Sequence, residues 1–204
     1  QAGHKRVLRG LSVAVIDAKD FCGATSANSL KIIHGGLRYL QRLDLVRTRE
    51  SVAERRNLMR LAPHLVHPLP CVMPTTGWGM RSRPVMRMGL LANDLLSYDR
   101  NTTGDPEKFI PAGRVISREE CLSILPGLAD RNVTGAAAWH DALAHNTERL
   151  VLGAVMAACG AGAVAANYVR LTGFVRNDRS VTGIVAEDAL TGARLTVPAR
   201  LVIN

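Results

Sequence analysis

The sequence predicts an α/β fold, in which a buried parallel sheet is combined with an inserted α+β segment. Three observations support this class. Residues 11–17, LSVAVID, form a short apolar run rich in β-branched side chains, which is typical of a parallel strand covered on both faces. Residues 44–61 place apolar side chains among charged ones at near-helical spacing. Residues 171–197 alternate short apolar runs with turn residues, which favours a small antiparallel meander.

The first elements have the order found in the second half of a βαβ unit. Residues 4–9 are expected to be the last turns of a helix that ends at Gly10, ahead of the strand at 11–17. Asp17 closes this strand, where dinucleotide-binding domains carry an acid that accepts hydrogen bonds from the adenosine ribose. An acid in this position is also common without any ligand. The glycine-rich turn of such domains is absent, so we expect a fragment that begins after it.

Caps, turn residues and periodicity predict the remaining elements. Ser117 and Glu120 have the spacing of a capping box, and Asn146 is expected to cap a later helix. Residues 200–204, RLVIN, are expected to begin another buried strand that is cut off, which again indicates a fragment. The other expected strands are 69–73, 133–143, 163–169, 171–175, 181–187 and 194–197, and the other expected helices are 44–61, 86–96, 117–125 and 147–159.

The composition is that of a globular protein, with 47% hydrophobic and 21% charged residues. The net charge of +9 would suit nucleic acid, anionic lipid head groups or a small anionic substrate. Aromatic residues make up only 4% of the chain, and no basic stretch is interleaved with them. We therefore expect no nucleic-acid binding.

The cysteines and the longest apolar segment indicate the setting of the protein. The four cysteines are too far apart for a paired C-x-x-C motif, so we expect reduced thiols, a cytoplasmic location and no metal site. No secretory signal is recognisable. Residues 150–169 are about long enough to span a bilayer, but Gly160, Gly162 and Asn167 interrupt them. We interpret this segment as a buried helix followed by a buried strand.

Residues 24–40 hold the side chains best suited to chemistry. The first half has short hydroxyl and amide groups and a cation, which suit a phosphate or the edge of a ring. Two glycines then allow the backbone to approach a flat ligand or adopt a positive φ. A titratable base, an anion-binding fork and a hydroxyl follow closely. The same residues could merely cap a helix and turn the chain. They are Thr25, Ser26, Asn28, Ser29, Lys31, His34, Gly35, Gly36, Arg38 and Tyr39.

Residues 20–40, DFCGATSANSLKIIHGGLRYL, closely resemble a segment of the FAD-dependent glycerol-3-phosphate dehydrogenases. The pattern D-F-x-x-x-T-S-x-x-S-x-K-[LI]-I-H-G-G-x-R-Y-L is typical of that family. The resemblance continues in residues 62–70 and 84–96 and, more loosely, in 140–150, whereas residues 139–146, WHDALAHN, differ from the usual D-D-A-R version. The chain therefore resembles a fragment of such an enzyme, in the DAO-type group of FAD-dependent oxidoreductases.

The resemblance implies a Rossmann-like FAD-binding domain of the glutathione-reductase type, incomplete here, with an inserted α+β substrate domain. Residues 1–66 would form the first part of the FAD-binding domain, residues 67–145 the substrate or cap domain, and residues 146–204 the truncated second part of the FAD-binding domain.

The resemblance also implies roles for individual residues. His34, Arg38 and Tyr39 would be catalytic, with His34 as the candidate base and Arg38 binding the substrate phosphate. The residues that would contact FAD are Asp17, Thr25, Ser26, Ser29, Lys31, His34, Gly35, Gly36 and Val169.

The implied reaction is oxidation of sn-glycerol 3-phosphate at C2 to dihydroxyacetone phosphate. Hydride passes to flavin N5, and electrons then pass to a quinone or another acceptor. The resemblance is also compatible with a homodimer and with peripheral contact on the inner face of the cytoplasmic membrane. Two alternatives stay open: another FAD-dependent oxidoreductase of the same fold, such as an amine or hydroxyacid oxidase, and a non-catalytic truncated remnant.

Overall fold

The computed structural model describes residues 10–40, 42–129 and 131–203. Its contacts divide the chain into two compact units. The first unit comprises Gln1–Ser29 and Thr147–Asn204, and the second comprises Leu30–Asn146. The predicted helix at residues 4–9 lies outside the described residues.

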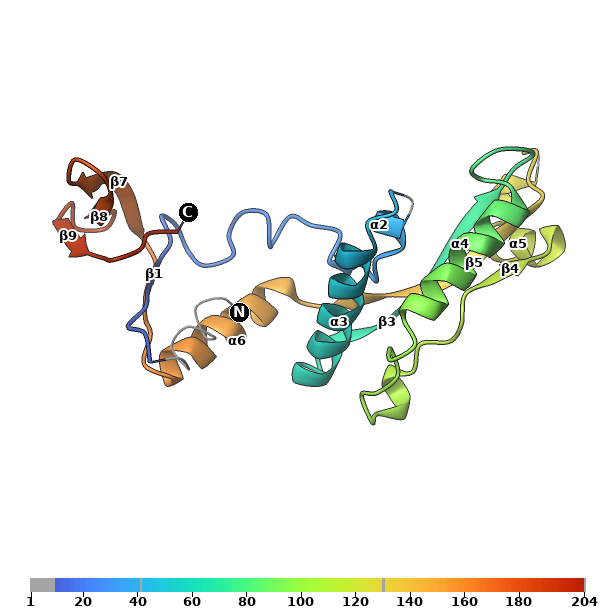
Figure 1. Ribbon diagram of the computed structural model, residues 1–204, viewed down its shortest axis with the longest axis horizontal. Coiled ribbons are helices and arrows are strands. Elements are labelled where there is room, and N and C mark those ends of the chain that lie inside the picture. Colours follow the sequence, from blue (N-terminus) through green and yellow to red (C-terminus); the bar gives the residue numbers. More distant parts are fainter. Residues whose placement is uncertain (1–9, 41, 130, 204) are drawn as a thin grey trace. The chain divides into compact units, whose positions relative to one another are not determined.

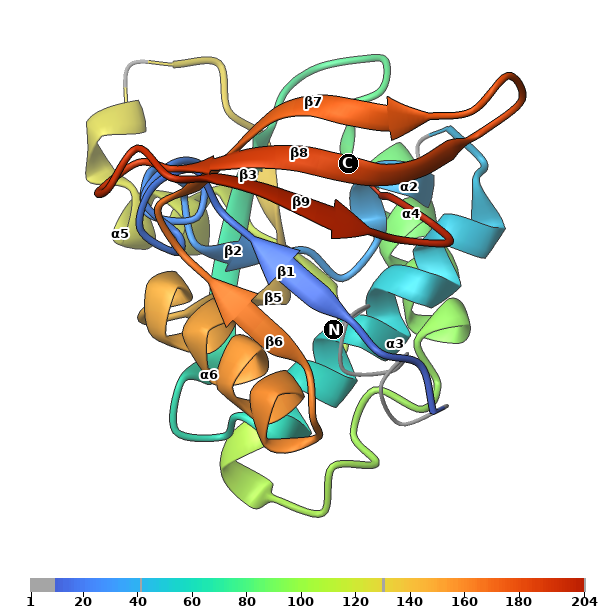
Figure 2. The ribbon, with the colours of Figure 1, turned by 90° about the vertical axis from the view of Figure 1, so that its left-hand side faces the viewer.

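The first unit contains a parallel strand pair. Strand β1 (Ala14–Ile16) pairs in parallel with β6 (Val164–Ala166) (Figure 2). In this register Ala14 lies opposite Val164. Helix α6 (Thr147–Gly160) leads into β6. This helix, strand and parallel partner confirm the α/β class at this end of the chain.

A three-stranded antiparallel sheet completes the first unit. Its strands are β7 (Val169–Arg176), β8 (Val181–Asp188) and β9 (Arg194–Pro198), as Figure 2 shows. The Asn177 side chain accepts hydrogen bonds from the backbone amides of Arg179 and Ser180, and Gly192 supplies a positive φ in the second turn. The predicted meander is therefore confirmed.

The second unit is built around strand β5 (Gly135–Ala144), which makes antiparallel pairs with three other strands: β2 (Ile32–Ile33), β3 (Val66–Thr75) and β4 (Arg114–Ile116). The β3–β5 pairing runs over the full ten residues of both strands. Because side chains alternate along β5, neighbouring alanines serve opposite faces. Ala136 packs with Ile116 and Cys121, whereas Ala137 packs with Met86 and Leu90.

Helices cover both faces of this sheet. Helices α3 (Leu45–Leu61) and α4 (Arg83–Leu96) contact one face, and α5 (Arg118–Ile124) packs on the other (Figure 1). Asp44 caps α3 by accepting from the Arg47 amide, and Ser117 caps α5 by accepting from the Glu120 amide. Three short elements complete the unit: α2 (Leu37–Leu40), η1 (Pro106–Lys108) and η2 (Pro126–Leu128).

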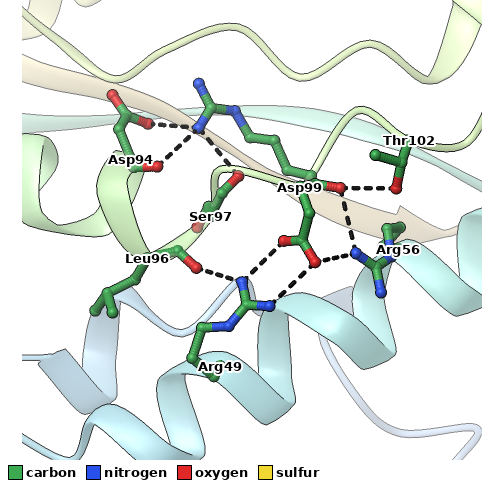
Figure 3. A network of polar contacts seen from close by, with 8 residues as sticks. Arg49, Arg56, Asp94, Leu96, Ser97, Asp99 and Thr102 are labelled. Carbon is green, nitrogen blue, oxygen red and sulfur yellow. Dashed lines mark hydrogen bonds and ion pairs between the residues drawn. The ribbon is translucent and has the colours of Figure 1, made fainter.

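An ion-pair network fastens α3 to the end of α4. Arg49 makes two hydrogen bonds to the Asp99 carboxylate, of 2.8 and 3.0 Å, and donates to the Leu96 carbonyl (Figure 3). Arg56 also pairs with Asp99. These hydrogen bonds, that from Arg49 first, lower the pKa of Asp99 well below its usual range, and partial burial opposes the shift. The network therefore fixes two helices that lie on the same face of the sheet.

Three sequence expectations need correction. Residues 201–203 are not a strand, because no described residue pairs with them, and Leu201 and Ile203 are exposed. Helix α6 was expected to be buried, but among its described residues only Ala158 is buried. The expected strand at 163–169 divides in two, because Tyr168 adopts a φ of +56° and redirects the chain from β6 into β7.

The two compact units also divide the chain differently from the domains expected above. Residues 30–66, expected in the FAD-binding domain, lie in the second unit, because β2 pairs with β5. The chain returns from the second unit to the first between residues 146 and 147, one residue after the expected boundary between 145 and 146. The assignment of the ranges 1–66, 67–145 and 146–204 to cofactor and substrate binding stays a prediction. No helix among the described residues is both long and apolar enough to cross a bilayer.

Candidate functional site

The pairing of β2 with β5 places His34 beside an acid. Ile33 lies opposite Ala142, so the next residue along the chain comes opposite Asp141. His34 Nδ1 lies 3.0 Å from Asp141 Oδ2. The His34 side chain is 53% exposed and that of Asp141 is 7% exposed. The accessible His34 imidazole is therefore in hydrogen-bond contact, through Nδ1, with a buried carboxylate.

The second oxygen of Asp141 binds the next residue of the same segment. The Gly35 amide donates to Asp141 Oδ1 at 2.8 Å. The Arg55 guanidinium lies 3.6 Å from this oxygen and donates to the His140 carbonyl at 2.8 Å. Burial lowers the pKa of Arg55, and the nearby Asp141 carboxylate opposes that shift. Asp141 thus joins the histidine, the glycine and a buried cation from α3.

Contacts with α3 explain the paired glycines. A Cβ on Gly35 would lie 1.9 Å from an Arg55 nitrogen, inside the space of the guanidinium. Gly36 has a φ of +96°, and a Cβ there would lie 2.8 Å from the Thr48 carbonyl oxygen. Close packing against α3 therefore requires both glycines, whatever ligand they approach. Their predicted contact with a cofactor stays a prediction.

The contact with Asp141 distinguishes the two ring nitrogens of His34. An ionised carboxylate only accepts hydrogen bonds, so this contact favours the tautomer with the ring proton on Nδ1. Nε2 then has the lone pair and can accept a proton. An imidazole held in this way can serve as a general base, and the carboxylate stabilises the imidazolium that forms.

Arg38 and Tyr39 follow on the short helix α2. Arg38 is exposed, and Tyr39 is partly buried. Within the part of the chain that the structure describes, neither side chain makes a hydrogen bond or ion pair. The structure therefore leaves the Arg38 guanidinium accessible but does not join it to His34, and the catalytic assignment of both residues stays a prediction.

Three buried polar atoms on or next to this centre have no hydrogen-bond partner among the described residues. They are Arg55 Nε, Trp139 Nε1 and His140 Nδ1. Burial, followed by the charge of Arg55, lowers the pKa of His140, which favours the neutral imidazole. Some buried polar atoms of this centre therefore lack a hydrogen-bond partner among the described residues.

A second candidate site lies in the first unit, at the carboxyl ends of β1 and β6. Ligands of open α/β sheets bind at this edge of parallel strands. Asp17 follows β1, and one of its carboxylate oxygens accepts from the Lys19 amide at 3.0 Å. The Val169 amide donates to the Asp17 carbonyl at 2.8 Å, so any contact between Val169 and an adenine would have to use another of its groups.

The hydroxyl-rich residues follow this edge as a series of turns. Thr25 and Ser29 are exposed, and Ser26 is partly buried. The Ser26 carbonyl accepts from the Thr147 hydroxyl at the start of α6, at 2.5 Å. Lys31 belongs to the second unit, where its carbonyl accepts from the Ala144 amide. The stretch expected to line one cofactor is therefore shared between the two units.

Asp141 and Arg55 were not predicted from the sequence. Asp141 is the one acid within the described strand β5, whose sequence is GAAAWHDALA, and a lone acid in an apolar strand indicates a buried partner. Arg55 shares a buried stripe of α3 with Thr48, Val52 and Met59, at helical spacing. Both signals were present, but neither identifies the partner, because Asp141 is 107 residues from His34.

Together these features define a class: an α/β protein with an acid at the carboxyl ends of a parallel strand pair and a histidine–carboxylate centre on a second sheet. The profile of the DAO family, described as FAD dependent oxidoreductase, matches residues 4–204. The chain belongs to this family.

Similar proteins agree with this assignment. A glycerol-3-phosphate dehydrogenase of Synechocystis sp. is 34% identical over 200 residues, which cover 97% of this chain and 35% of that protein. The structure of a glycerol-3-phosphate dehydrogenase from Bacillus halodurans complexed with FAD has a TM-score of 0.64 at 22% identity, over 97% of this chain and 29% of that one.

An L-proline dehydrogenase from P. horikoshii has a TM-score of 0.62 at 18% identity, over 95% of this chain and 46% of that one. The fold is thus shared by enzymes that act on different substrates. The chain spans about a third of the length of the curated glycerol-3-phosphate dehydrogenase that it matches.

Proposed function

We propose that the protein containing this chain oxidises sn-glycerol 3-phosphate at C2 to dihydroxyacetone phosphate, with FAD as its cofactor. One observation carries the proposal: the half-exposed His34 ring faces the buried Asp141 with Nδ1, which leaves Nε2 as its proton-accepting nitrogen, within an H-G-G-L-R-Y-L segment. Such a base is what removal of a hydroxyl proton requires. The sequence similarity to a glycerol-3-phosphate dehydrogenase supports the choice of substrate.

The residues of the first unit fit the adenosine end of FAD. The Asp17 carboxylate follows a parallel strand, where it can accept hydrogen bonds from ribose hydroxyls. The exposed Thr25 and the neighbouring Ser26 and Ser29 offer hydroxyl donors to phosphate oxygens. Lys31, which belongs to the second unit, is assigned to FAD as a cation. FAD, when bound, supplies the hydride acceptor at flavin N5.

The second unit supplies the acid–base chemistry in this proposal. His34 Nε2 takes the proton of the C2 hydroxyl as the C2–H bond breaks, and the Asp141 carboxylate stabilises the charge on the ring. The exposed Arg38 guanidinium can bind the substrate phosphate by donating two parallel hydrogen bonds. Tyr39 is assigned to the same substrate site. Electrons then leave to a quinone or another acceptor.

Peripheral contact with an anionic membrane surface is also part of the proposal. Trp78 is fully exposed in the loop before α4. Further exposed apolar side chains on this loop and helix are Met80, Met88, Leu91 and Leu95, and exposed cations are Arg81, Arg83 and Arg87. Apolar side chains flanked by arginines suit the interface of an anionic bilayer. Salt-sensitive cosedimentation with anionic vesicles, lost in Trp78→Ser, would support this contact, and undiminished binding by the variant would refute it.

A second function is favoured by the shared fold. The likeness to L-proline dehydrogenase extends over 95% of this chain, so an amine substrate needs a direct test. In an amine oxidation the base would take a proton from nitrogen, and the exposed Arg38 would meet a carboxylate instead of a phosphate.

A substrate panel decides between these functions. The flavin-loaded full-length protein would be mixed without oxygen with sn-glycerol 3-phosphate, glycerol, L-proline and glycine, and loss of the oxidised-flavin absorbance would be followed. We expect rapid bleaching with sn-glycerol 3-phosphate, and none with glycerol because it lacks the anion that Arg38 would bind. Bleaching by an amino acid alone would establish the alternative, and bleaching by none would favour a non-catalytic remnant.

A further inference from the structure

We infer that Asp141 is a positioning residue that sets the tautomer of His34. The inference rests on the proposed function, because it assigns a role toward a base that acts on substrate. It starts from the observation that the two oxygens of the Asp141 carboxylate have different hydrogen-bond partners. Oδ1 accepts from the Gly35 amide at 2.8 Å, and Oδ2 faces His34 Nδ1 at 3.0 Å.

Each oxygen fixes a different property of the segment. The bond to Oδ1 holds the backbone, and thereby the direction from which the ring emerges. The bond to Oδ2 holds the ring proton on Nδ1, which leaves the Nε2 lone pair for the substrate. Asp141 itself is buried and cannot reach a substrate directly, so it acts through His34.

The surroundings of Asp141 match a carboxylate with this task. The buried Arg55 guanidinium lies 3.6 Å from Oδ1, and its positive charge compensates the negative charge of the Asp141 carboxylate. That guanidinium is held by the His140 carbonyl and fills the space beside Gly35. The acid is therefore fixed by three different elements, α3, β5 and the segment after β2, and its two oxygens cannot exchange partners without displacing Gly35.

The substitution Asp141→Asn separates this role from a merely structural one. The asparagine Oδ1 can still accept from Gly35, whereas its amide nitrogen can only donate to His34 Nδ1. The ring proton must then move to Nε2, which loses the ability to accept a proton. In a serine protease the same change leaves the geometry intact and lowers kcat by about 10⁴-fold.

The experiment uses the flavin-loaded full-length protein with ¹⁵N-labelled histidine, and the ring signals of His34 are assigned by their loss in His34→Gln. We expect the Nδ1–H form in the unmodified protein and the Nε2–H form in Asp141→Asn. Turnover of sn-glycerol 3-phosphate should fall by about 10³- to 10⁴-fold with little change in KM. Asp99→Asn, which removes another largely buried acid of the second unit, should leave the His34 tautomer unchanged.

The outcomes distinguish the inference from the proposed function. An Nε2–H form in the unmodified protein would overturn the inference even if the variant did not fold. The same tautomer in both proteins, or undiminished turnover in Asp141→Asn, would also overturn it and leave Asp141 with only its bond to Gly35. If the tautomer inverts while no substrate of the panel is oxidised, the positioning role stands and the proposed function fails.

Discussion

The two candidate sites are built in different ways. The centre around His34 is made of side chains from separate elements, and its acid is 7% exposed and within 3.6 Å of a buried guanidinium. The edge beside Asp17 is made of chain ends and turns, and its acid is held by the amide of Lys19, two residues along the chain. The first depends on long-range packing, and the second on local geometry.

This difference predicts how each site responds to substitution. A buried charge that loses its partner retains the cost of its desolvation, so changes around Arg55 and Asp141 should disturb folding as well as chemistry. A partly exposed carboxylate next to water loses little when it is replaced. Substitutions at Asp17 should therefore alter ligand binding and leave stability nearly unchanged.

The largest effect is expected from Gly35→Ala. The new Cβ would lie 1.9 Å from an Arg55 nitrogen, so the buried guanidinium would have to leave the His140 carbonyl. We expect a loss of about 3–5 kcal/mol in the free energy of unfolding, measured by urea denaturation.

Gly89→Ala on α4 is the matched control for this substitution. It has open space around the added methyl group and should be neutral or up to about 1 kcal/mol stabilising. Equal stability of the Gly35 and Gly89 variants would show that Arg55 is not packed against Gly35.

A smaller loss, about 1.5–3 kcal/mol, is expected from Asp99→Asn, because Arg49 and Arg56 would lose the carboxylate between them (Figure 3). The contribution should also depend on pH. The pKa of Asp99 is lowered in the folded protein, so its stabilisation is fully present above the unfolded pKa of about 4 and disappears as pH falls through the lower folded value.

Urea denaturation between neutral and acidic pH would measure this dependence. The gap between the unmodified protein and Asp99→Asn should be widest near pH 7 and shrink as the solution becomes acidic. A gap that stays constant would mean that the ion pairs do not determine the difference.

The smallest effect on stability is expected from Asp17→Asn. The affinity for FAD should fall by roughly tenfold, equivalent to about 1.4 kcal/mol, because an ionised acceptor of ribose hydrogen bonds becomes neutral. Fluorescence titration with FAD would measure the change, and Asp178→Asn, an exposed acid in a turn of the meander, serves as the control. Identical affinities would remove Asp17 from the cofactor site.

Local signals in the sequence predicted much of the fold. Ser117 caps α5 where expected, and the meander turns near Asn177 as predicted, with the Asn177 side chain accepting from the Ser180 amide. These features depend on a few neighbouring residues, so their physical causes are visible in a short window. The glycines at 35 and 36 and the exposed His34 were likewise marked by their local pattern.

The centre itself could not be predicted in the same way. β2 has only two residues, and its pairing with β5 joins positions more than a hundred residues apart. A shift of one residue in that register would turn Asp141 to the other face of the sheet, away from His34. Local propensity does not determine such a register. The division of residues 24–40 between two units escaped prediction for the same reason, since it follows from the partners of each half.

A single-turnover comparison of His34→Ala with the unmodified protein tests most directly whether His34 is the base. Both would be loaded with FAD and mixed with sn-glycerol 3-phosphate without oxygen, and the rate of flavin reduction would be recorded. Removal of the base should slow reduction by about 10²- to 10⁴-fold, while His64→Ala, at an exposed histidine after α3, keeps the original rate. Flavin reduction at the unmodified rate in His34→Ala would contradict the assignment of His34 as the base.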